Sequence, residues 1–185
     1  MSGQIEQIVR EKIAAAVDAP PPRLTRRDAE LPTIPGKALA VIGMRRAGKT
    51  SFLHQCRADL IAAGRTPNRM LYFNFEDERL AGLTAADFHV IPDTHLRMYP
   101  EPANEPVSLF LDEIQLVSGW ETVIRRLLDT PGHEVFLSGS SAKLLIRVRL
   151  RPGCLTLQGI SGFACLVRRV SGRNRMRLTR LSCGL

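Results

Sequence analysis

The sequence predicts an α/β domain in which helices cover both faces of a central parallel sheet, giving three layers. Short apolar runs alternate with stretches whose apolar residues recur every three or four positions, a pattern typical of repeated strand–helix–strand units. The chain has 185 residues, of which 44% are hydrophobic and 24% are charged. It is therefore long enough and apolar enough for one domain with a substantial core.

The first expected element is an amphipathic helix over residues 4–17. Apolar side chains recur there at helical spacing, and the pattern stops before three consecutive prolines, Pro20 to Pro22. We therefore assign residues 1–22 to an N-terminal helix and a Pro-rich linker. Residues 23–36 contain two more prolines and are expected to form an extended lead-in to the core.

Four strands are expected in the body of the chain, because four short apolar runs are bounded by Gly, Pro or polar residues. They cover residues 39–42, 70–75, 107–111 and 134–137. These strands place the core of the domain within residues 23–145.

Two helices are expected between these strands. Residues 49–63 have a helical apolar pattern, and Gly64 follows where a helix C-terminal glycine is common. Residues 120–128 repeat apolar side chains at three- and four-residue spacing and end before Pro131. Residues 93–106 contain four prolines if Pro92 is included, and they are expected to form a loop or a poorly ordered insertion.

A phosphate-binding motif lies between the first expected strand and the helix that follows it. Its glycines allow consecutive backbone N–H groups to approach a phosphate, and the helix N-terminus adds a favourable dipole. We expect Lys49 to reach the β- and γ-phosphates and the Thr50 hydroxyl to bind Mg²⁺. The motif has the form G-x-x-x-x-G-K-T and, with the next residue, comprises Gly43, Met44, Arg45, Arg46, Ala47, Gly48, Lys49, Thr50 and Ser51.

Two adjacent acids, Asp112 and Glu113, follow the third expected strand. Ligands of open α/β sheets bind at the carboxyl ends of the strands, so these acids are expected beside the phosphates, in the Walker B arrangement. Asp112 is expected to hold Mg²⁺ through water, and Glu113 to orient and deprotonate the attacking water. The two motifs together predict a nucleotide-binding site.

Hydroxyl side chains follow the fourth expected strand, in the order Ser138, Gly139, Ser140 and Ser141. If this strand lies between the first and the third, Ser140 is expected to sense the γ-phosphate or its attacking water. Alternatively, these serines cap a short helix over residues 142–145.

The stretch from Arg26 to about Leu145 resembles the prokaryotic AAA+-like P-loop ATPases, in which a separate C-terminal domain follows the ATPase domain. The resemblance implies a P-loop NTPase fold, ATP as the nucleotide, Mg²⁺ as the cofactor and self-association into a homo-oligomer. It rests on four motifs in order, at residues 43–50, 72–80, 109–121 and 137–145.

The chain departs from this family pattern after Leu145, so the fold is expected to be incomplete at the C-terminus. Residues 155–158 faintly resemble the family's fifth strand. A trans-acting arginine is expected in this region, and the candidates are Arg147, Arg149 and Arg151.

The net charge of +8 is concentrated in the same region. Residues 146–185 contain nine arginines and no acid, whereas residues 1–145 sum to −1. This atypical Arg-rich tail is interpreted as the truncated or frame-shifted end of a longer gene product. The alternative is a basic tail that binds nucleic acid through its phosphates.

Several other classes of site and protein are not indicated. The histidines lack metal-ligand spacing, no segment approaches the roughly 18 apolar residues of a membrane span, and the N-terminal apolar run is too short for a signal peptide. We therefore expect a cytoplasmic protein with reduced thiols. The cysteines lack C-x-x-C spacing and are Cys56, Cys154, Cys165 and Cys183.

The sequence thus favours a Mg²⁺-dependent ATPase that couples hydrolysis to a conformational change. The alternative is a nucleotide-dependent interaction module that binds ATP without useful turnover. Its basic tail would contact nucleic acid or an acidic partner. A kinase is less favoured, because no acceptor-site residues are identifiable and the Asp-Glu pair favours water as the nucleophile.

Overall fold

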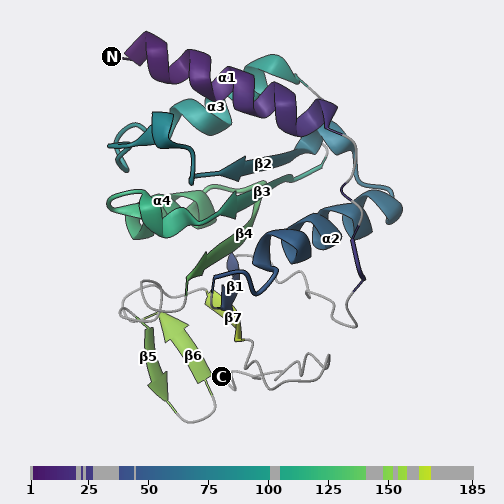
Figure 1. Cartoon of the computed structure of the whole chain (residues 1–185), viewed down its shortest axis with the longest axis vertical. Coiled ribbons are helices and arrows are strands. Elements are labelled where there is room, and N and C mark those ends of the chain that lie inside the picture. Colours follow the sequence, from purple (N-terminus) through teal and green to yellow (C-terminus); the bar gives the residue numbers. More distant parts are fainter. Residues whose placement is uncertain are drawn as a thin grey trace.

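Five parallel strands form the sheet at the centre of this computed structural model, in the order β2-β3-β4-β1-β7 (Figure 1). The structure describes residues 2–19, 22, 24–26, 38–43, 45–100, 105–140, 148–151, 154–157 and 163–167. All four strands expected from the sequence are confirmed. The sheet comprises β1 (Ala38–Gly43), β2 (Met70–Asn74), β3 (Val107–Asp112), β4 (His133–Ser140) and β7 (Phe163–Val167).

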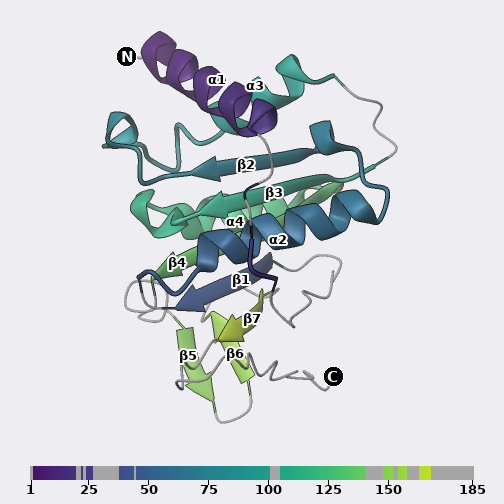
Figure 2. The same cartoon turned by 45° about the vertical axis from the view of Figure 1, so that its right-hand side comes forward.

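Helices cover both faces of the sheet, so the expected three layers are confirmed. α2 (Lys49–Ala62) lies on one face, where Phe52, Leu53 and Cys56 pack on strand residues such as Phe110. α4 (Trp120–Asp129) lies on the opposite face, as the second view shows (Figure 2). Short 3₁₀ turns are η1 (Pro67–Arg69), η2 (Glu78–Leu80) and η3 (Ile114–Leu116).

The end of α2 agrees with the glycine expected there. Gly64 has a left-handed φ of 93°, and its N–H donates to the Ile61 carbonyl while that of Arg65 donates to the Leu60 carbonyl. These two bonds form a Schellman motif, which satisfies carbonyls that would otherwise lack partners. The helix therefore ends before the chain turns toward β2.

The open edge of the sheet at β2 lies beside two helices, α1 (Ser2–Asp18) and α3 (Val90–Met98) (Figure 1). The expected N-terminal helix is therefore confirmed. Val9 and Ile13 of α1 have no exposed surface and belong to the same core cluster as α4 and one face of the sheet. None of the helices in the described part of the chain is both long and apolar enough to cross a membrane.

The loop expected at residues 93–106 is partly wrong, because α3 occupies its first half. Pro92, one of the four prolines that suggested a loop, lies in the first turn of this helix. A proline is tolerated there, since the N–H groups of the first turn have no acceptor within the helix.

The fifth strand of the sheet differs from the one expected at residues 155–158. β6 (Cys154–Leu157) pairs antiparallel with β5 (Val148–Arg151) in a separate two-stranded sheet, whereas β7 pairs parallel with β1. The fifth strand is therefore the apolar run at Phe163–Val167, within the segment interpreted as a tail. The short helix considered at residues 142–145 and most of the lead-in at 23–36 lie outside the described residues.

Candidate functional site

The predicted phosphate-binding segment joins the end of β1 to the first turn of α2 (Figure 2). Arg46 and Gly48 have left-handed φ values of 58° and 74°. Left-handed residues in such a turn direct neighbouring N–H groups toward one side, as in anion-binding nests. α2 begins at Lys49 without a side-chain cap, an arrangement that suits an anion at the helix N-terminus. Met44 lies outside the described residues.

Asp112, the last residue of β3, has no exposed surface. Three hydroxyl groups donate hydrogen bonds to its carboxylate. Thr50 donates to Oδ2 at 2.7 Å, Tyr72 donates to the same oxygen at 2.8 Å, and Ser138 donates to Oδ1. The structure therefore brings Thr50 and Asp112, the two predicted metal ligands, into direct contact.

Glu113 follows immediately but is held in a different way. Its backbone turns into the left-handed region, with φ 57° and ψ 41°, and its N–H donates to Ser138 Oγ at 3.2 Å. One carboxylate oxygen lies 3.1 Å from Lys49 Nζ, and the other accepts a hydrogen bond from Gln115. The lysine and the glutamate, both predicted to act on the nucleotide, thus form a buried ion pair with each other.

Ser140, the third predicted catalytic residue, lies in register with Gly43 at the end of β1. The expected position of this strand between the first and the third is confirmed by the sheet order. Another serine of this strand, Ser138, contacts both acids, and the sequence analysis did not select it. Strand alternation would not have singled it out, because Ser138 and Ser140 are two residues apart and alternation predicts the same face for both.

Tyr72 on β2 is a second site residue that the sequence analysis did not identify. Burial, and then the Asp112 charge, raise the pKa of its hydroxyl far above its usual value, so the group stays protonated and remains a donor. The ring of His54 packs against the Tyr72 ring at a centroid distance of 4.3 Å. Burial, and then Arg57, lower the pKa of His54, so this imidazole is neutral at pH 7.

The residues present fit a magnesium ion. Asp112 is a fully buried carboxylate whose hydroxyl partners are uncharged, so its negative charge is not neutralised by them. A carboxylate and a threonine hydroxyl are oxygen donors of the kind that Mg²⁺ prefers, with nucleotide phosphates and water supplying the remaining ligands. Asp112 and Thr50 would hold the ion.

The site as a whole combines an anion-binding turn with two acids at the carboxyl edge of a parallel sheet. Lys49 and Glu113 are both buried, with 6% and 8% of their surface exposed, so their interaction is weakly screened by solvent. Such an arrangement can bind a phosphate chain and hold a base beside it.

Residues 35–152 match the protein family described as an AAA domain. The uncharacterized protein MJ1544 of Methanocaldococcus jannaschii is 34% identical over 140 residues, which is 76% of this chain and 29% of that protein. An uncharacterized protein of Haemophilus influenzae is 30% identical over 106 residues, which is 57% of this chain and 26% of that protein. This chain thus spans less than a third of the length of these curated relatives.

The segment that matches the family covers more than half of the chain and contains all of the site residues described above. The parallel sheet, with its phosphate-binding turn after β1 and its acids after β3, agrees with that match. The chain therefore belongs to the AAA-domain family of P-loop NTPases.

Proposed function

We propose that this chain binds ATP with Mg²⁺ and hydrolyses it to ADP and phosphate, and that the nucleotide state changes its conformation. The observation that supports this proposal is the contact between two separate motifs. Thr50 lies against Asp112 and Lys49 lies against Glu113, although 62 residues separate Thr50 from Asp112 in the chain. The AAA family supports ATP as the nucleotide.

Binding of the phosphate chain would use residues 43–51. The backbone of the turn and the N-terminus of α2 would surround the β-phosphate, and Lys49 would leave Glu113 to contact the β- and γ-phosphates. Bound at Thr50 and Asp112, Mg²⁺ would neutralise phosphate charge and help to orient the triphosphate. Nucleotide binding would therefore separate Glu113 from its cationic partner.

Hydrolysis would use Glu113 as the general base. Once Lys49 has moved to the phosphates, the freed carboxylate would accept a proton from water while the water oxygen bonds to the γ-phosphorus. The bond from the γ-phosphorus to the bridging oxygen breaks, and ADP retains that oxygen. Gln115 would keep the glutamate oriented through its hydrogen bond to the second carboxylate oxygen.

Two further parts of the proposal concern the fourth strand and self-association. Ser140, in register with Gly43, would sense the γ-phosphate or its attacking water. An arginine from a second copy of the chain would supply positive charge to the transition state, with Arg147, Arg149 and Arg151 as candidates.

The substitution Glu113→Gln tests the hydrolysis step, because glutamine keeps the size and polarity of glutamate but cannot accept the proton. We expect phosphate release to fall at least about tenfold while ATP still binds, as measured by steady-state turnover and by calorimetry. Glu78→Gln, at an exposed glutamate on η2, is the matched control. Wild-type turnover in Glu113→Gln would show that this residue is not the base.

A second candidate function is an interaction module that binds ATP without useful turnover. The observation that favours it is the charge of residues 146–185, whose nine arginines and absent acids suit a polyanion such as nucleic acid. The same turnover assay distinguishes the two functions. A wild-type chain that binds ATP and releases no phosphate above background would favour the module.

A further inference from the structure

We propose that Tyr72 is a positioning residue for the metal site, acting through Asp112. The inference rests on the proposed function, in which Asp112 holds Mg²⁺. Tyr72 lies on β2, the edge strand, and its hydroxyl reaches the neighbouring strand to donate to Asp112 Oδ2 at 2.8 Å. It thereby connects the edge of the sheet to the acid at the end of β3.

Tyr72 is one of three hydroxyl groups that donate to the Asp112 carboxylate. Oδ2 accepts from Thr50 and Tyr72, whereas Oδ1 accepts from Ser138. When the Thr50 hydroxyl is used for the metal, Tyr72 and Ser138 still hold one carboxylate oxygen each. The orientation of the carboxylate is then preserved, as is typical of the outer hydrogen bonds that orient metal ligands.

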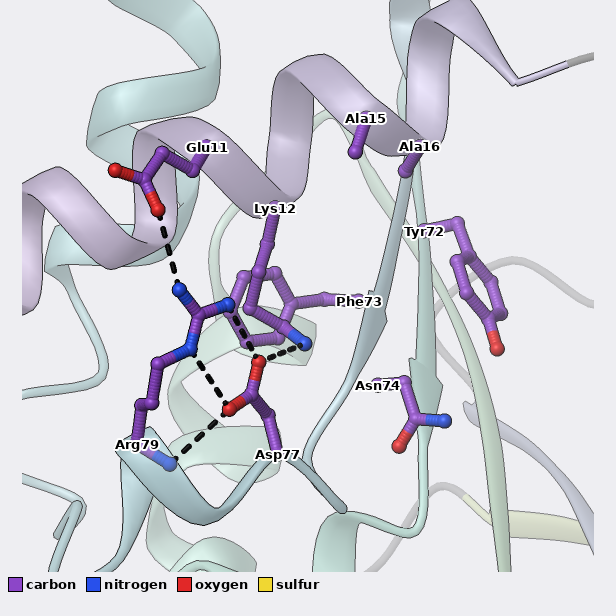
Figure 3. Close-up of a pocket in the computed structure, with 9 residues that line it drawn as sticks. All are labelled: Glu11, Lys12, Ala15, Ala16, Tyr72, Phe73, Asn74, Asp77 and Arg79. Carbon is purple, nitrogen blue, oxygen red and sulfur yellow. Dashed lines mark hydrogen bonds and ion pairs between the residues drawn. The ribbon is translucent and has the colours of Figure 1, made fainter.

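The position of the Tyr72 ring is itself defined by its neighbours. The His54 ring packs against it, and the Tyr72 ring also packs against the apolar core between α2 and the sheet. Figure 3 shows Tyr72 and Asn74 on the same side of β2, with Phe73 on the other. A tyrosine held in this way can direct its hydroxyl at one acceptor without losing further side-chain freedom when the metal binds.

A groove of about 370 Å³ between α1 and β2 is lined by Tyr72 and by a cluster of charged residues (Figure 3). In that cluster Asp77 pairs with both Lys12 and Arg79. These charges are already paired with each other, whereas the Tyr72 hydroxyl is directed to Asp112. The metal-site role therefore belongs to the tyrosine and not to the charged cluster.

The test uses Tyr72→Phe, which keeps the ring that packs on α2 and removes only the hydroxyl. Mn²⁺ serves as the probe, and its binding to the full chain with ADP is followed by electron paramagnetic resonance. We expect the Mn²⁺ dissociation constant to rise about tenfold, the lower end of the range for loss of a group that hydrogen-bonds to a metal ligand. ADP affinity measured with EDTA should stay within about twofold of wild type, since the phosphate contacts are unchanged.

The matched control is Tyr99→Phe at the other tyrosine of the chain, whose ring packs near His95 and whose hydroxyl is not among the described donors to Asp112. This variant should bind Mn²⁺ like wild type. Wild-type Mn²⁺ affinity in Tyr72→Phe, or an equal loss of Mn²⁺ and metal-free ADP affinity, would overturn the positioning role. A wild-type chain that binds neither nucleotide nor Mn²⁺ would instead overturn the proposed function and this inference with it.

Discussion

Asp112 and Glu113 are adjacent in the chain, yet their carboxylates have different partners. Asp112 ends a fully buried strand, and its carboxylate accepts only from hydroxyl donors among the described hydrogen bonds, whereas Glu113 turns into the left-handed region and meets Lys49. A non-glycine residue in that region stores about 1–3 kcal/mol of strain and is common at functional sites. The turn at Glu113 therefore directs two adjacent carboxylates to different partners, and the proposed division into a metal ligand and a base depends on that difference.

His95 is a buried residue outside the nucleotide site, with 1% of its surface exposed and no hydrogen-bond partner for either ring nitrogen within the described residues. Burial, followed by the charges of Arg69 and Arg57, lowers its pKa from 6.5 to about 4. Since the pKa is lower in the folded chain than in the unfolded chain, the unfolded chain binds more protons between these two values. Stability must therefore fall as the pH decreases through this window.

We expect the free energy of unfolding to lose up to about 3 kcal/mol from this group between pH 6.5 and pH 4. Urea denaturation of wild type and of His95→Gln across that range measures the effect. The variant should lose this part of the pH dependence, because glutamine does not titrate there. Equal pH dependence in the two proteins would contradict the assignment to His95.

At the scale of elements, α1 covers the open edge of the sheet beside β2. An uncovered edge strand presents unpaired backbone groups and can pair with another chain. The charged contacts of α1 with Asp77 and Arg97 are at least partly exposed and contribute little each. Burial of apolar side chains is the larger contribution, since Val9 and Ile13 have no exposed surface.

Ile13→Ala should therefore lower the free energy of unfolding by about 2–4 kcal/mol, through lost burial and the cavity that remains. Ile61→Ala is the matched control, because that isoleucine on α2 is 40% exposed and should cost less than about 1 kcal/mol. Urea denaturation with a common slope gives both values. Equal small costs would mean that α1 is not packed on the sheet in solution.

At the scale of the whole molecule, the parts of the site that could be predicted are short motifs of consecutive residues. The phosphate-binding turn and the pair Asp112-Glu113 each occupy a few consecutive residues next to a strand. Tyr72 and Ser138 could not be assigned in this way, because their contacts to Asp112 depend on which strands are neighbours. Strand order is a property of the folded sheet.

Two elements of the fold, α3 and β7, were not predicted from the sequence, each for a different physical reason. Pro92 suggested a loop, but a proline in the first turn does not interrupt a helix. The strand Phe163–Val167 lies in a segment whose arginines dominated its interpretation, although the five strand residues contain no charge. The apolar run of this strand, and not the net charge of the surrounding segment, is the sequence feature that agrees with its pairing to β1.

The turn at residues 43–51 is proposed to bind the triphosphate of ATP, with Lys49 as its cation. Calorimetric titration of Mg²⁺-ATP into wild type, Lys49→Ala and Lys12→Ala tests it most directly. Because Lys49 would make charge-assisted contacts to two phosphates, we expect Lys49→Ala to weaken ATP binding at least about a hundredfold. Lys12→Ala, at the lysine that pairs with Asp77 outside the turn, should bind like wild type. Wild-type affinity in Lys49→Ala, or no ATP binding by the wild-type chain, would contradict the claim.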